Sequence, residues 1–286
     1  MMRALYIVVL GSLMTAVLGC AGDKEKDPIW KGLKIGDLAP ATTGKSSNSL
    51  NIINFKALVF ELPAEKVSAL DAVRTVLYAE PVRFRNFNVF TANSFSVVFG
   101  QSRMWPRVAD LLYGADAQRV QTISLMLSDD EINDFPIFSL LARQSVFHKT
   151  ATGSLEAGGT GPGLLALRVE AQRIPGLRGI CSFTARPAFI SALAGTLAQR
   201  SMGEGSAEFE FAGTEFRLKM TPGDFFIMAP AGQIDSQMAL GSYFFNRPRP
   251  SKRRFFIRSS EQAERRQLYF GPVVRLYLFV CVSIGE

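Results

Sequence analysis

The sequence predicts an α+β fold, with an α+β first half over residues 52–150 and a predominantly antiparallel β second half over 151–286. Hydrophobic residues make up 48% of the 286 positions, which is enough for a sizeable core and excludes a wholly disordered chain. Aromatic residues reach 11%, with 23 Phe, and such side chains suit half-buried pleated sheets. The same composition excludes collagen-like, coiled-coil and multi-spanning membrane classes.

The first half alternates strands with short helices. Residues 52–60 are rich in strand formers, and residues 64–78 place apolar side chains at three- and four-residue spacing, which predicts an amphipathic helix. Residues 82–99 carry five Phe among polar residues and predict two strands joined near position 92. Pro106 lies just inside a predicted helix start, Gly114 ends that helix, and a strand follows over 121–127.

The second half is predicted to consist of strands, beginning after the glycine-rich run 153–163. In residues 165–171 apolar side chains occupy odd positions, a period of two that indicates a sheet with one buried face. Residues 181–185 and 216–220 follow the same rule, and residues 274–284 are aliphatic at even positions. This last strand is long enough either to cross a bilayer when tilted or to lie in a soluble sandwich, and both interpretations stay open.

The N-terminus has the features of a secretory signal peptide over residues 1–19. Arg3 precedes an apolar run over 4–17 that is short for a bilayer span and ends in Leu18-Gly19-Cys20. The run Val17-Leu18-Gly19-Cys20 resembles the lipobox of bacterial lipoproteins. This resemblance implies that Cys20 is acylated and attaches the chain to a membrane by lipid, and Ala21 favours the periplasmic face of the outer membrane.

Between the anchor and the folded part, residues 20–51 are polar and turn-rich, and they predict a flexible lipidated tether. A second polar segment, 246–269, carries eight cations against two carboxylates and so holds a net charge of +6. We expect a mobile cationic loop that attracts anionic lipid headgroups or an acidic envelope protein, with mere solubilisation as the alternative and no nucleic acid as partner. The candidate anion-binding residues are Arg247, Arg249, Lys252, Arg253, Arg254, Arg258, Arg265 and Arg266.

The sequence contains no pattern typical of an active site, a cofactor site or a metal site. His148 is the only histidine, and no Gly-x-Ser-x-Gly motif accompanies it. The glycine-rich run lacks the Gly-Lys-Ser/Thr ending that binds phosphate, and Asp129-Asp130-Glu131 lacks calcium-loop spacing. Cys181 and Cys281 could pair in an oxidising compartment or remain buried thiols, and these alternatives stay open.

The second half also resembles the channel domain of bacterial secretins, the ring-forming outer-membrane channels of secretion and pilus systems. Residues 161–171 followed by 179–187 are similar to its paired strands, residues 220–230 to its turn and hydrophobic run, and residues 240–244 to its Leu-Gly-x-Leu-Phe segment. The family's ring-building domains have no counterpart here, and no Pro-x-Leu-Gly-Asp-Ile-Pro stretch precedes Leu240. The resemblance therefore implies a reduced, lipid-anchored relative without catalytic residues.

Together these features predict a non-enzymatic, lipid-anchored cell-envelope protein with a structural or assembly role. It would engage its partner through sheet edges or the cationic loop. The alternative is an extracytoplasmic lipoprotein that binds a small ligand in a pocket lined by Phe87, Phe95, Trp105 and Tyr113, residues whose spacing equally suits a core.

Overall fold

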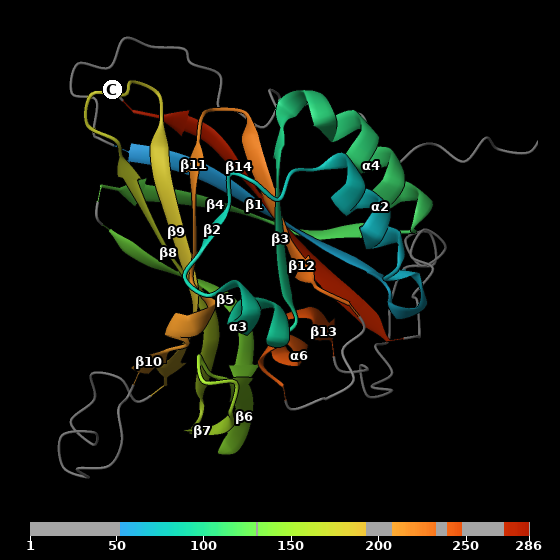
Figure 1. Cartoon of the computed structure of the whole chain (residues 1–286), viewed down its shortest axis with the longest axis vertical. Coiled ribbons are helices and arrows are strands. Elements are labelled where there is room, and N and C mark those ends of the chain that lie inside the picture. Colours follow the sequence, from blue (N-terminus) through green and yellow to red (C-terminus); the bar gives the residue numbers. More distant parts are fainter. Residues whose placement is uncertain (1–51, 130, 193–207, 233–238, 248–271, 286) are drawn as a thin grey trace, which may run out of the picture. The chain divides into compact units, whose positions relative to one another are not determined.

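Two antiparallel six-stranded sheets form most of the structure, a computed structural model that describes residues 52–129, 131–192, 208–232, 239–247 and 272–285 (Figure 1). Sheet A has the order β3 (Phe95–Gln101), β12 (Asp224–Pro230), β14 (Val273–Ile284), β1 (Ile52–Pro63) and β4 (Gln118–Ser128), and β13 (Asn246–Arg247) also pairs with β14. Sheet B has the order β2 (Arg83–Phe84), β11 (Phe216–Met220), β9 (Cys181–Ser191), β8 (Gly163–Arg173) and β5 (Ile132–Leu140), and β10 (Glu208–Glu210) also pairs with β9. A separate hairpin joins β6 (Gln144–Lys149) to β7 (Leu155–Thr160).

The predicted α+β class is wrong, because the described chain as a whole is mostly antiparallel sheet with few and short helices. Strand β1 of the first half pairs with β14 of the second half over almost its whole length. Strand β5 likewise pairs with β8. Each sheet therefore combines strands from both sides of position 150, and that position does not separate one sheet from another.

The described helices are short. The predicted helix over 64–78 is a single turn, η2 (Ala64–Lys66), followed by α2 (Ala69–Val76), and the predicted helix at Pro106 is α4 (Trp105–Gly114), preceded by η3 (Ser102–Met104). In the segment 82–99, the second predicted strand is β3, but the first is reduced to the two residues of β2, and α3 (Phe87–Ala92) lies between them. The side chain of Asn86 accepts a hydrogen bond from the Val89 backbone N–H at 3.1 Å, so an N-cap overrides the strand propensity of the phenylalanines. The remaining helical segments are η4 (Ala212–Thr214) and α6 (Leu240–Phe245).

Sheet A lies between sheet B on one face and helical segments on the other. On one face, Phe226 of β12 stacks on Phe279 of β14 with ring centroids 4.9 Å apart, and both rings contact Phe183 of β9 in sheet B. On the opposite face, Trp105 of α4 contacts Phe60 and Phe225. Figure 1 shows α2 and α4 side by side next to β3.

Because sheet A is covered on both faces, β14 is buried on both faces as well. The six consecutive residues from Leu276 to Cys281, which point alternately to the two faces, are all buried. The Tyr277 hydroxyl donates a hydrogen bond to the Phe244 carbonyl at 2.7 Å, which satisfies the one polar atom of that buried ring. Burial also raises the pKa of Tyr277 above its ordinary value.

A substitution in the phenylalanine layer between the sheets should lower the stability of the protein more than one at its surface. Replacing Phe226 by Ala removes a fully buried ring that contacts Phe183, Phe216 and Phe279, and should lower the free energy of unfolding by about 3–5 kcal/mol. Phe87→Ala is the matched control, because Phe87 is 58% exposed and its loss should cost about 1 kcal/mol or less. Urea unfolding followed by circular dichroism measures both, and equal losses would contradict the layered core.

Candidate functional site

Strand β4 forms one outer edge of sheet A, and no described strand pairs with its other side. It is eleven residues long, and its side chains over 122–128 alternate strictly between outward and inward. Leu125 and Leu127 point into the core, whereas Met126 is 67% exposed. The free side of β4 thus presents a row of backbone N–H and C=O groups beside a partly apolar surface.

At the other three ends of the two strand orders the edge strands are shielded, as far as the structure describes them, and β10 and β13 have only three and two residues. Strand β2 has only two residues, which leaves little to pair with. Strand β5 carries Pro136 and a register shift immediately after it, both of which interrupt regular pairing. Strand β3 is capped where the backbone N–H and C=O of Phe99 each bond to Tyr78 at 2.8 Å.

None of these devices protects β4 over most of its length. The strand contains no proline, and its one charged residue is Arg119, near its start. A register shift against β1 lies close to Arg119, which leaves 121–128 as a regular edge. Since proteins normally shield such edges, β4 is the best candidate for pairing with an extended segment of another chain.

Several charged side chains on the outer face of sheet B form one ion-pair network. Arg168 of β8 binds the Asp134 carboxylate through two nitrogens at 2.8 and 2.9 Å, and it contacts Glu208 and Glu210 of β10 at 3.1 Å each. Arg186 of β9 lies 2.8 Å from the same Glu210. The three carboxylates raise the pKa of Arg168 further above its ordinary value. This network attaches β10 to the sheet, and its charges are already paired.

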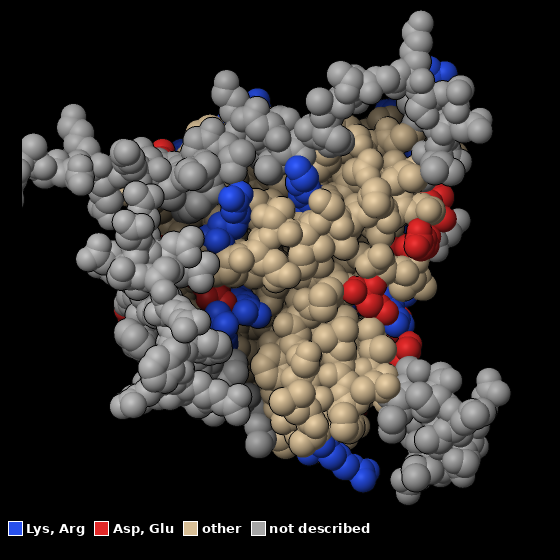
Figure 2. Space-filling view, turned by 180° about the vertical axis from the view of Figure 1, so that it is seen from behind, with Lys and Arg blue, Asp and Glu red and all other residues tan. Residues whose placement is uncertain are grey.

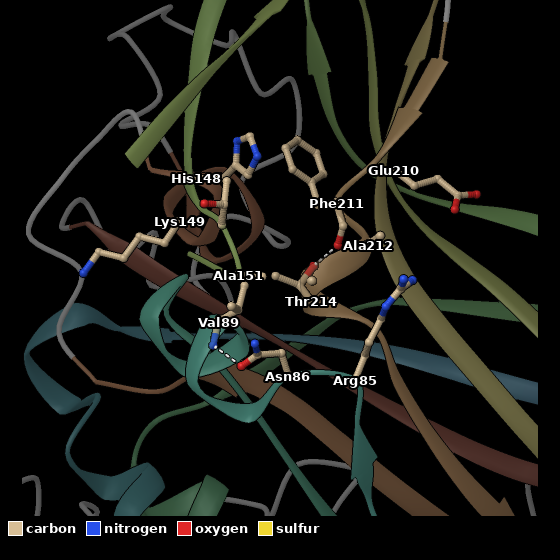
Figure 3. Close-up of a pocket in the computed structure, with 12 residues that line it drawn as sticks. Arg85, Asn86, Val89, His148, Lys149, Ala151, Glu210, Phe211, Ala212 and Thr214 are labelled. Atoms are coloured by element: carbon tan, nitrogen blue, oxygen red, sulfur yellow. Dashed lines mark hydrogen bonds between the residues drawn. The ribbon is translucent and has the colours of Figure 1, made fainter. Parts of the chain in front are cut away.

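A cavity of about 360 Å³ lies where α3, the end of β6 and the β10–η4 segment meet (Figure 3). Val89, Phe211 and Ala212 provide apolar walls, while Arg85 and Lys149 contribute cations. Figure 3 shows the rings of His148 and Phe211 beside each other, with centroids 5.0 Å apart.

The polar groups of this cavity are poorly arranged for proton transfer. The Thr214 hydroxyl donates to the Phe211 carbonyl at 2.7 Å, so its proton is already engaged. The Nδ1 atom of His148 is buried and has no hydrogen-bond partner in the described structure. Burial lowers the pKa of His148, and the Glu156 carboxylate opposite it in the hairpin partly offsets that shift. The cavity is therefore better suited to holding a small molecule than to acid–base chemistry.

The sequence-predicted site residues fall mostly outside the described residues. The predicted site residues that lie outside are Cys20 and the cations Arg249, Lys252, Arg253, Arg254, Arg258, Arg265 and Arg266. Arg247 is described, and its guanidinium lies 3.0 and 3.1 Å from the two carboxylate oxygens of Glu61. Arg275 also binds Glu61 at 2.9 Å, so part of the positive charge of Arg247 is balanced within the fold.

The aromatic pocket considered from the sequence does not form as a unit. Phe95 and Trp105 are core residues with exposures of 0% and 5%, while Phe87 is exposed on α3. The spacing of these residues could not distinguish a core position from a pocket position, because both kinds of position show the same periodicity.

Among the described residues, no group of three or more His, Cys, Asp or Glu side chains is arranged to hold a metal ion. None of the helices in that part of the chain has the length and apolar character needed to span a membrane. Comparisons with protein-family models, with curated proteins and with solved structures found no match. Uncharged residues fill most of the described surface in Figure 2, and the charged side chains lie in small groups around them.

The lowered pKa of His148 predicts a pH dependence of stability. Because the folded-state pKa lies below the ordinary value of 6.5, the unfolded chain binds a proton more readily, so stability is complete above 6.5 and falls as pH drops through it. His148→Gln does not titrate in this range and should lose less stability than the native chain between pH 7.5 and 5. Thermal unfolding at both pH values gives the difference, and a steeper loss in the variant would refute the assignment.

Proposed function

We propose that this protein is a non-enzymatic, lipid-anchored cell-envelope protein with a structural or assembly role. The observation that carries the proposal is the open edge of β4, which offers backbone pairing to an extended segment of an envelope partner. In this reading the partner adds a strand to sheet A, and main-chain hydrogen bonds supply much of the affinity. Alternate side chains such as Thr122, Ser124 and Met126 would supply the selectivity.

The membrane part of the proposal rests on the sequence. The apolar run ending at Cys20 supports a lipid anchor on the periplasmic face of the outer membrane, and the cations over 249–266 support contact with anionic headgroups or an acidic partner. The most specific form of the proposal is a reduced secretin-like component of a secretion or pilus system. Residues 163–173 and 181–191 pair as β8 and β9, an arrangement common to many antiparallel proteins, so this form depends on the sequence resemblance.

An alternative function is small-ligand binding in an extracytoplasmic space, favoured by the cavity beside His148. Its apolar walls with Arg85 and Lys149 suit a small amphiphile that carries a negative charge, because the carboxylate of its lining, Glu210, is already paired with Arg168 and Arg186. A thermal-shift screen with short fatty acids separates this function from the assembly role, because strand addition requires no ligand in that cavity.

Loss of the anchoring cysteine should release the protein from the membrane. Cys20→Ser removes the acylation site, and the variant should move from the detergent phase to the aqueous phase on partitioning, because acyl chains dominate membrane affinity. Thr75→Ser is the control, since it is a small change on the exposed surface of α2 that leaves the acylation site intact. Unchanged partitioning of the Cys20 variant after removal of residues 1–19 would show that lipid is not the anchor.

The β4 edge should bind a polypeptide in the cell. A photo-crosslinking residue placed at Met126 should give a discrete higher-mass adduct, whereas the same residue at exposed Thr75 on α2 should not. Adding Thr122→Lys and Ser124→Lys should reduce the adduct about tenfold, because two charges along the edge disfavour strand addition by on the order of 1–2 kcal/mol.

The control for these lysines is Thr75→Lys, which adds charge away from any sheet edge. Circular dichroism and thermal unfolding should show that all variants are folded. An adduct at twice the chain mass would identify a second copy as the partner. If Met126 gives no adduct, or if the two lysines leave it unchanged, β4 is not the binding edge.

A further inference from the structure

Two buried thiols lie together between the two sheets. Cys181 is the first residue of β9 in sheet B, and Cys281 lies near the end of β14 in sheet A. Both residues are 0% exposed, and Cys181 is near enough to Cys281 to raise the pKa of its thiol. The chain between them is about a hundred residues long, so their contact is a product of the fold and not of the local sequence.

The packing of the neighbouring rings accounts for this contact. Phe183 follows Cys181 by two residues on β9, and Phe279 precedes Cys281 by two residues on β14. The two rings meet across the sheets with centroids 6.1 Å apart. Since side chains two positions apart share one face of a strand, both cysteines point into the same layer as these rings.

The pair joins interior strands of the two sheets. Strand β14 is flanked by β12 and β1, and β9 is flanked by β11 and β8. The backbone around Cys281 is also fixed, because its carbonyl accepts a hydrogen bond from the Gly223 N–H at 2.8 Å. Two cysteine side chains that enter the same layer from well-held strands need little backbone movement to reach disulfide geometry.

We propose that Cys181 and Cys281 are oxidised to a disulfide that joins sheet A to sheet B. This covalent modification is independent of the assembly role and of the β4 edge. It stabilises the sandwich by restricting the unfolded chain, and the large loop that it closes makes this effect strong.

The oxidation requires an external disulfide as the electron acceptor, either a small-molecule disulfide or a dithiol oxidoreductase. One cysteine, as thiolate, attacks a sulfur of that disulfide, which forms a mixed disulfide and releases the first acceptor thiolate. The second cysteine then displaces the remaining acceptor sulfur and closes the Cys181–Cys281 bond. Two electrons pass to the acceptor, which leaves as two thiols after taking up the two protons that the cysteines lose.

The surroundings determine when this reaction occurs. Contact with Cys181, burial and the nearby Asp224 carboxylate all raise the pKa of the Cys281 thiol, so the reactive thiolate is scarce in the folded protein. No external reagent reaches either sulfur in the closed core. The bond therefore forms while the sheets come together, and the folded reduced protein is slow to oxidise.

Refolding the full chain tests the proposal, with Cys20→Ala to remove the third thiol. The chain is refolded in mild detergent with a mixture of oxidised and reduced glutathione, and remaining thiols are then blocked with N-ethylmaleimide under denaturing conditions. We expect no maleimide adduct, and a tryptic peptide pair linked through Cys181 and Cys281. Protein refolded with reductant and only then exposed to oxidised glutathione should keep two modifiable thiols.

Stability supplies the second measurement. The oxidised form should unfold at a higher urea concentration than the reduced form of the same chain, and this difference should vanish in the variant carrying Cys181→Ala and Cys281→Ala. The oxidised and reduced forms that retain Cys181 and Cys281 can be compared with each other even if the double variant does not fold. Two maleimide adducts on the chain refolded in glutathione, or glutathione attached to each cysteine, would overturn the proposal.

Discussion

The layer of aromatic rings between the two sheets is the interaction on which the rest of the structure depends. Phe226 and Phe279 stack within sheet A, and Phe183 of sheet B packs against both. Phe135 extends the layer by contacting Phe279 at 5.2 Å. These residues come from four strands spread over the chain, so none of the strands can bury its apolar face until the others have paired.

This constraint explains where the polar chemistry lies. Sheet A is buried on both faces over most of its interior strands, where Lys56, Glu61 and Arg275 are charged residues that stay partly exposed. Charged residues are therefore found at strand ends and on the outer face of sheet B, where they neutralise one another, as Glu61 does with Arg247 and Arg275. In the part of the chain that the structure describes, the β4 edge and the cavity beside His148 are open to another molecule, as is a second cavity of about 550 Å³ lined by residues 173–180.

The same layer connects the two proposals without making either depend on the other. The β4 edge is the outer end of sheet A, and its inward residues Leu125 and Leu127 anchor it to the core. A bond between Cys181 and Cys281 would fix the interior strands against each other and leave that edge free. A rigid sheet with one open edge pairs with an incoming strand at a lower entropic cost than a flexible one.

The sequence by itself determined the local pattern of most strands. Alternation with a period of two correctly indicated β8, β9, β11 and β14, and Pro106 correctly marked the start of α4. It did not reveal the fold class, because strands β5 and β6 lack clear alternation and the Asn86 cap inserts a helix among strand-forming phenylalanines. Only the tertiary structure decided which strand is an open edge, that Arg247 pairs with Glu61, and that Cys181 meets Cys281. Each of these properties depends on residues tens to hundreds of positions apart, and local periodicity records which face of a strand is buried but not which neighbour buries it.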